Sequence, residues 1–109
     1  MKVSYAICVC DEHREIDALV SFLLKVKDAE DEINVLMDSN KATQKVRDVL
    51  ASYGESIVVN ERAFDGKFSD HRNHHATLCA GDYIFVVDAD EMPQEALVRN
   101  IKTFDGDIL

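Results

Sequence analysis

Three acidic residues, Asp88, Asp90 and Glu91, follow directly on the apolar run 83–87. Two carboxylates two positions apart at the end of a strand can face the same way and share one hard divalent cation. Mg²⁺ and Mn²⁺ prefer oxygen ligands and keep coordination positions for water or phosphate oxygens. A cation held in this way would act as a Lewis acid on a diphosphate leaving group. The same residues could instead be exposed acids that favour the N-terminus of the next helix, and the spacing alone leaves both interpretations open.

Carboxylates follow two further apolar runs of the chain. Asp11 and Glu12 come directly after the first run, and Asp38 comes after the second. Because ligands bind at the carboxyl ends of the strands of a parallel sheet, we expect these acids to gather with Asp88 at one edge. The sequence therefore predicts a ligand site at that edge.

The elements that must position these acids alternate in type along the chain. Strands are expected over four apolar runs, residues 3–10, 33–37, 57–59 and 83–87. Apolar side chains at helical spacing predict helices over residues 14–27 and 42–53. A third helix is expected over residues 69–80, just before Gly81, and Pro93 suits the first turn of a fourth. Gly54 should end the second helix in the left-handed conformation, and residues 60–68 should form a loop. This pattern predicts an α/β fold, a Rossmann-like parallel sheet with flanking helices.

Length and charge exclude several classes of protein. At 109 residues the chain is expected to form a single domain, residues 1–109. Its net charge is −9 and its Lys and Arg residues are scattered, whereas nucleic-acid binding relies on clustered basic residues, so we expect no nucleic-acid partner. An acidic chain can still bind a nucleotide when a divalent cation bridges the two. Neither a signal-like start nor a run of about 18 apolar residues is present, so we expect no membrane span and a cytoplasmic location.

The cysteine and histidine residues are interpreted as structural. Cys8 and Cys10 are two apart in a predicted strand, so both should point to one face as buried, reduced packing residues. The spacing of His71 with His74 or His75 would allow a zinc site, but no third ligand stands at a familiar spacing. We therefore expect one of these histidines to pack against the sheet and the others to be exposed.

Two stretches of the sequence resemble family 2 glycosyltransferases of the GT-A fold. They are Phe68-Ser-Asp-His-Arg72-Asn73 and Ala80-Gly-Asp-Tyr-Ile-Phe-Val-Val-Asp88-Ala-Asp90-Glu91. In that family an Arg-Asn pair opens a helix, an Ala-Gly-Asp-Tyr turn follows, and a strand delivers an Asp-x-Asp (DxD) motif. The acidic pair after the first strand and the Asp-Ser pair after the second also match, so the resemblance spans nearly the whole chain.

The resemblance implies a donor site for a nucleotide-diphosphate sugar that works with Mn²⁺ or Mg²⁺. Asp90 would be the direct metal ligand and would bridge the ion to the diphosphate, with Asp88 near the ribose or the metal-bound waters. Asp38 would contact the base, typically uracil, which indicates a UDP-sugar. Arg72 would approach the base or the phosphates, where its guanidinium suits oxygen acceptors.

The remaining parts of the family pattern match less completely. The end of the first strand, residues 9–12 with Asp11 and Glu12, would lie against the nucleotide. The family usually continues its second-strand Asp as Ser-x-Asp-x-Thr, and here only Thr43 corresponds. Family members also continue well beyond this length, and their further part supplies the acceptor surface and the general base. We therefore expect residues 1–109 to lack the acceptor-binding half, to bind the donor, and to transfer sugar weakly or not at all.

Three other functions compete with this interpretation. A haloacid dehalogenase-like phosphatase also carries Asp-x-Asp after a strand, but it has Thr or Val where this chain has Met92. A receiver domain would need an Asp after its third strand, where this chain has Asn60. A non-catalytic nucleotide- or metal-binding module that self-associates stays open, because an incomplete parallel sheet would expose an apolar edge and face. On that ground we expect a homo-oligomer.

Overall fold

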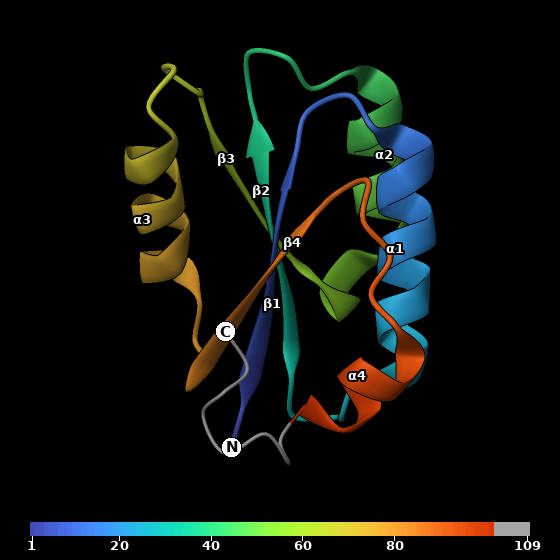
Figure 1. Ribbon diagram of the computed structural model, residues 1–109. Coiled ribbons are helices and arrows are strands. Elements are labelled where there is room, and N and C mark those ends of the chain that lie inside the picture. The colour runs from blue at the N-terminus through green and yellow to red at the C-terminus, as the bar shows by residue number, and fades with distance from the viewer. Residues whose placement is uncertain (102–109) are drawn as a thin grey trace.

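A four-stranded parallel sheet forms the centre of the molecule (Figure 1). The computed structural model describes residues 1–101, with the strands β1 (Val3–Val9), β2 (Glu32–Asp38), β3 (Val58–Arg62) and β4 (Tyr83–Asp88). They lie in the order β3-β2-β1-β4, and every neighbouring pair is parallel. The carboxyl ends of all four strands therefore point to the same edge, which is at the top of Figure 1.

Within the described residues, four α-helices cover the two faces of this sheet. They are α1 (His13–Val26), α2 (Gln44–Ser52), α3 (Phe68–Leu78) and α4 (Glu95–Arg99), with one 3₁₀ turn, η1 (Gly54–Ser56), after α2. In Figure 1, α1, α2 and α4 lie on one face and α3 lies alone on the other. This arrangement confirms the predicted α/β fold with a Rossmann-like parallel sheet. Over residues 1–101, no helix is both long and apolar enough to cross a membrane.

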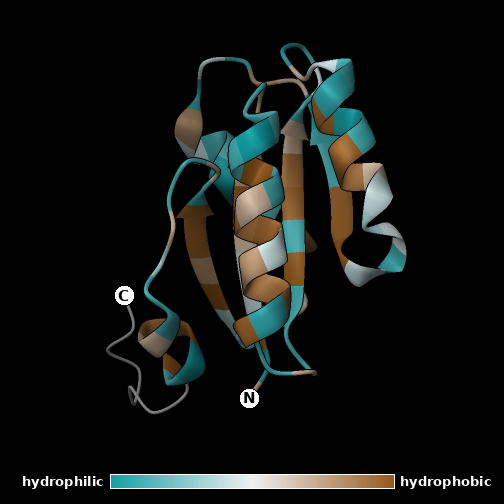
Figure 2. Ribbon diagram, turned by 90° about the vertical axis from the view of Figure 1, so that its right-hand side faces the viewer, coloured by the Kyte–Doolittle hydropathy of each residue, from teal (hydrophilic) through white to brown (hydrophobic). Residues whose placement is uncertain are grey.

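The main core lies between the sheet and the helices α1, α2 and α4. Alternate residues of β1 point to this face and are buried, namely Val3, Tyr5, Ile7 and Val9. They share the core with one stripe of α1, namely Ile16, Leu19, Val20 and Leu23. Figure 2, viewed from this side, shows apolar segments of the strands running behind α1. Burial of this stripe, rather than helix propensity alone, holds α1 against the sheet.

The opposite face of the sheet is packed by α3 through polar contacts. The buried His75 has its Nε2 at 3.0 Å from the Asn34 carbonyl oxygen and 3.1 Å from Asn34 Oδ1. Asn34 Nδ2 donates to the Leu78 carbonyl oxygen, so Asn34 Oδ1 must accept. His75 therefore carries its proton on Nε2, and its bare Nδ1 lies 3.7 Å from Cys8 Sγ. Burial lowers the pKa of this imidazole, which favours the neutral form.

The structure differs from the predicted elements in two places. β3 continues to Arg62, where the sequence predicts a loop from residue 60, because these polar residues pair with β2. Helix α4 begins at Glu95, so Pro93 lies before the helix and not in its first turn. Gly54 has a φ of +56°, which confirms the predicted left-handed end of α2. A possible strand at residues 107–109 lies outside the described residues.

The buried neutral His75 predicts a stability that depends on pH. Its pKa is lowered in the folded state, so its contribution is complete above the ordinary histidine pKa and is lost as the pH falls below that value. Urea unfolding at about pH 7.5 and about pH 5.5 should show a lower free energy of unfolding at the acidic pH. His75→Gln should reduce this difference without abolishing it, because burial also lowers the pKa of His71. His13→Gln, at the first residue of α1, should leave it unchanged, because His13 is not among the charges that shift the pKa of His71 or His75. An equal pH dependence in all three proteins would contradict this account.

Candidate functional site

The carboxyl ends of β1, β2 and β4 meet at one edge of the sheet. In the sheet register, Cys8 lies opposite Leu36 of β2 and opposite Asp88 of β4. β1 ends one residue later at Val9, and β2 ends at Asp38. The structure therefore brings together the ends of the three strands that the sequence marks with carboxylates.

A cavity of about 240 Å³ lies at this edge, between the sheet and the first turns of α3. Three residues singled out from the sequence line it, Asp38, Arg72 and Asp88. The rest of its lining consists of Cys8, Val9, Cys10, Lys41, Phe64, Phe68, His71 and Val86. We call this space the donor-side cavity. Asp11, Glu12 and Asp90 are not part of its lining.

Asp38 is buried at the donor-side cavity, with 2% of its surface exposed. Its Oδ1 accepts hydrogen bonds from the backbone N–H groups of Asn40 at 3.0 Å and Phe64 at 3.2 Å. Its Oδ2 has the Cys10 thiol at 3.9 Å, which is a weak donor. Within the described residues, this carboxylate therefore keeps one oxygen able to accept a strong hydrogen bond from a ligand.

The acidic pair after β1 occupies two different environments. Glu12 is half-buried, and its Oε1 accepts from the N–H groups of Cys10 and Asp11, each at 2.9 Å. These bonds close the turn between β1 and α1, so this carboxylate oxygen is directed to the backbone. Asp11 is exposed and follows Cys10, which lines the donor-side cavity. The pair therefore lies next to the cavity, and the Glu12 carboxylate is hydrogen-bonded within the turn.

Asp88 and Asp90 are exposed on either side of Ala89, which is buried in the core. Glu91 Oε1 accepts from the Asp88 N–H at 3.1 Å, and the Glu91 N–H donates to the Asp88 carbonyl oxygen at 2.9 Å. Partial burial raises the pKa of Asp88, and the neighbouring Glu91 and Asp90 raise it further, while Arg72 lowers it. Negative charge is therefore concentrated around Asp88 at the end of β4.

Several residues that line the donor-side cavity were not predicted as site residues, among them Cys8, Phe64 and Phe68, whereas Cys10 belongs to the segment 9–12 that was expected against the nucleotide. Cys8 and Cys10 share one face as predicted, but the prediction of full burial is wrong, because both are only half-buried and line the cavity. Both are free thiols, and burial raises the pKa of each, so the neutral thiol is favoured. Phe64 and Phe68 stand in a segment predicted to be a loop, where no periodic pattern marks them.

Two of the three α3 histidines are buried, rather than the predicted one. His71 Nδ1 lies 3.2 Å from Arg62 Nη1, and a guanidinium only donates, so this nitrogen accepts. Burial and the Arg62 charge lower the pKa of His71. His75 is bonded to Asn34, and His74 is exposed. Over the part of the chain that the structure describes, no three His, Cys, Asp or Glu side chains form a group that could hold a metal ion, and this applies to the α3 histidines and to the acids after β4 alike.

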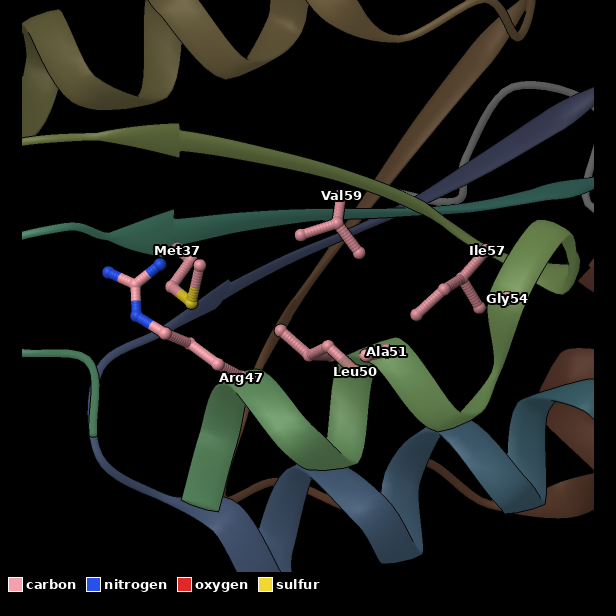
Figure 3. Close-up of a pocket in the computed structure, with 7 residues that line it drawn as sticks. All are labelled: Met37, Arg47, Leu50, Ala51, Gly54, Ile57 and Val59. Carbon is pink, nitrogen blue, oxygen red and sulfur yellow. The ribbon is translucent and has the colours of Figure 1, made fainter. Parts of the chain in front are cut away.

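A second cavity, of about 370 Å³, lies on the other face of the sheet, between α2 and the strands β2 and β3. Figure 3 shows the residues that line it, which are Met37, Arg47, Leu50, Ala51, Gly54, Ile57 and Val59. The charged group among them, Arg47, has its Nη1 paired with Glu61 Oε1 at 2.6 Å. Since the remaining lining is apolar and contains no carboxylate, this cavity is less suited to a nucleotide and a metal ion than the donor-side cavity.

The parallel sheet, with polar residues gathered at the carboxyl ends of its strands, defines a Rossmann-like α/β domain whose ligand site is expected at that edge. The family model described as glycosyl transferase family 2 matches residues 4–105. The chain therefore belongs to glycosyltransferase family 2, as its sequence motifs indicate. Among curated proteins, none matches the chain.

Among solved structures, the chain is similar to the mannosyltransferase PcManGT from Pyrobaculum calidifontis, determined in complex with GDP-Man and Mn²⁺. The TM-score is 0.74 and the sequence identity is 16%, so this likeness concerns the fold. It covers 96% of this chain and 32% of the mannosyltransferase, so the chain spans about a third of that protein's length. The GT-A type of fold expected from the motifs is confirmed.

The crowding of carboxylates after β4 predicts that Glu91→Gln lowers the pKa of Asp88, because Glu91 is the charge that raises it most. The measurement is an NMR pH titration of the Asp88 carboxyl carbon in both proteins. Glu95→Gln is the matched control, since it removes an exposed carboxylate that pairs with Arg99 in α4. An Asp88 pKa that is unchanged in Glu91→Gln, or that moves equally in the control, would contradict the electrostatic account.

Proposed function

We propose that residues 1–109 form a nucleotide-sugar-binding domain, which binds a UDP-sugar through a divalent cation at Asp88 and Asp90 for glycosyl transfer to an acceptor. The observation that carries this proposal is the meeting of Asp38, Arg72 and Asp88 around one cavity, next to the exposed Asp90. Membership of glycosyltransferase family 2 supports it, as does the likeness to a structure that contains GDP-Man and Mn²⁺.

The residues after β4 fit a hard divalent cation, Mn²⁺ or Mg²⁺. Asp88 and Asp90 offer oxygen ligands, and their mutual repulsion would be relieved by a positive charge. Two protein carboxylates leave coordination positions for water and for diphosphate oxygens, as is usual for these ions. When bound, the cation supplies Lewis-acid stabilisation of the diphosphate leaving group. Asp90 would be its direct ligand, and Asp88 would contact metal-bound water or the ribose.

Asp38 favours uracil over guanine as the base. Its Oδ1 already accepts two backbone hydrogen bonds, so Oδ2 is the oxygen that can accept an N–H from a base. Uracil presents one ring N–H between two carbonyl oxygens. Guanine presents two adjacent donor nitrogens, and leaving one of them without a partner would cost about 1–3 kcal/mol. Lys41 also lines the cavity and can donate to a carbonyl oxygen of the base.

Arg72 and the turn after β1 complete the proposed donor site. Arg72 has an exposed side chain in α3 and is close enough to Asp88 to lower its pKa. Its guanidinium can therefore donate to a diphosphate or a base near the cation. Asp11 and Glu12 would lie along the nucleotide, with Glu12 holding the shape of the turn through its two backbone hydrogen bonds.

A non-catalytic binding module that self-associates is the second candidate. Val86 on β4 and Val58 and Val59 on β3 are exposed, so both outer strands of the described sheet carry apolar surface. On this basis we propose a homo-oligomer, and light scattering that shows a monomer at high concentration would contradict it. The free thiols suit a reducing compartment, which supports a cytoplasmic location.

Calorimetric titration with UDP tests the donor site. The wild-type protein should bind UDP when Mn²⁺ is present and should lose this binding without metal. Asp90→Asn should weaken metal-dependent binding by at least about tenfold, which is the loss typical of a disturbed metal site. Asp48→Asn is the matched control, because it changes an exposed aspartate on α2 that accepts a hydrogen bond from Gln44. This variant should bind UDP as the wild type does.

Two further titrations separate the parts of this proposal. Tighter binding of GDP than of UDP would contradict the assignment of uracil but would not contradict the proposed metal site. Absence of binding by either nucleotide to the folded protein with Mn²⁺ would contradict the donor site itself. Sugar-nucleotide hydrolysis or transfer above background would separate an enzyme from a binding module.

A further inference from the structure

Phe68 is a large apolar side chain left exposed at the donor-side cavity. It is the first residue of α3, and 70% of its surface is exposed. The centroid of its ring lies 4.8 Å from that of Phe64, with the planes at 48°. Phe64 in turn meets His71 edge-on, with centroids 5.2 Å apart. All three rings line the cavity, so they form a row with Phe68 at its exposed end.

The inner part of this row is fixed by hydrogen bonds. The Phe64 N–H donates to Asp38 Oδ1 at 3.2 Å, which holds the backbone that carries the middle ring. His71 is buried and accepts from Arg62. Within residues 1–101, Phe64 is the aromatic ring in contact with Phe68, and most of the Phe68 surface is open to solvent. Phe68 therefore presents an exposed aromatic ring that is supported by Phe64 and lies at the same cavity as the buried carboxylate of Asp38.

A planar heteroaromatic ring is the ligand that fits this arrangement. Aromatic rings pair with their centroids about 4.5–7 Å apart, and nucleic-acid bases stack on aromatic side chains through their π-faces. Asp38 Oδ2 can accept an N–H from the edge of such a ring. The cavity volume of about 240 Å³ is below the range of about 300–1,000 Å³ that is typical of drug-sized ligands. This size suits a base with part of its ribose better than a whole nucleotide sugar.

We propose that Phe68, supported by Phe64, is the stacking platform for the base of the donor nucleotide. This inference rests on the proposed function and adds a contact that the function does not itself require. Asp38 binds the edge of the base, and Phe68 covers its face. Val9 and Cys10 line the same cavity from the end of β1, so the base lies between this strand end and α3.

Comparison of UDP with inorganic pyrophosphate isolates the stacking contact, because pyrophosphate has no base. With Mn²⁺ present, Phe68→Leu should weaken UDP binding by roughly tenfold or more, the size of one base–aromatic stack, and should leave pyrophosphate binding unchanged. Phe68→Trp should retain UDP binding. The uracil H5 and H6 signals of bound UDP should shift upfield in the wild type and in Phe68→Trp, but less in Phe68→Leu.

Phe22→Leu is the matched control, since Phe22 lies in α1 on the other face of the sheet, and this variant should bind both ligands as the wild type does. Because Phe68 is exposed, its variants should unfold at the wild-type urea midpoint. Unchanged UDP affinity in Phe68→Leu would overturn the stacking role and leave the proposed function standing. Equal weakening of UDP and pyrophosphate would also overturn it. A wild-type protein that binds neither ligand with Mn²⁺ would overturn the proposed function and this inference together.

Discussion

Parallel pairing of β1 with both of its neighbours is the constraint on which the rest of the structure depends. Because β1 lies between β2 and β4 and all three run the same way, segments far apart in the sequence end at one edge. Because of the pleat of β1, alternate side chains of this strand point to opposite faces of the sheet, one facing the core and the other facing the cavity. Tyr5 and Ile7 point into the core with α1, whereas Cys8 points to the opposite face and borders the donor-side cavity. A slip of one residue in the register would exchange these faces.

The polar groups at this edge are stabilised in two different ways. Asp38 is buried and receives backbone hydrogen bonds, so its geometry is fixed without any ligand. Asp88 is exposed and stands next to Asp90 and Glu91, which raise its pKa, and Arg72 offsets this only in part. One end of the site thus has a fixed hydrogen-bond acceptor, and the other end carries an excess of negative charge. Under the proposed function, a divalent cation would balance that excess and would hold the diphosphate, while Asp38 would bind the base.

Helices and strands were predictable where a local pattern of apolar residues marks them, as the helical spacing of Ile16, Leu19 and Leu23 marks α1. The polar end of β3 was not, because only its pairing with β2 holds it as a strand. The gathering of strand-end carboxylates followed from the α/β pattern, and the family motifs added Arg72. The bond from Glu12 to its own turn and the row of rings ending at Phe68 were not predictable, since both depend on how a loop folds. The burial of His71 was missed because α3 offers few apolar residues to pack.

The central claim is that a cation at Asp88 and Asp90 holds the diphosphate of a nucleotide at the carboxyl edge of the sheet. Paramagnetic broadening tests it most directly, by adding substoichiometric Mn²⁺ and UDP to ¹⁵N-labelled protein. The account predicts that the amide signals of residues 88–91 broaden first, followed by those of residues 10–12 at the adjacent end of β1. Broadening centred on the acidic segment 28–32, or spread evenly over the exposed acids, would contradict it.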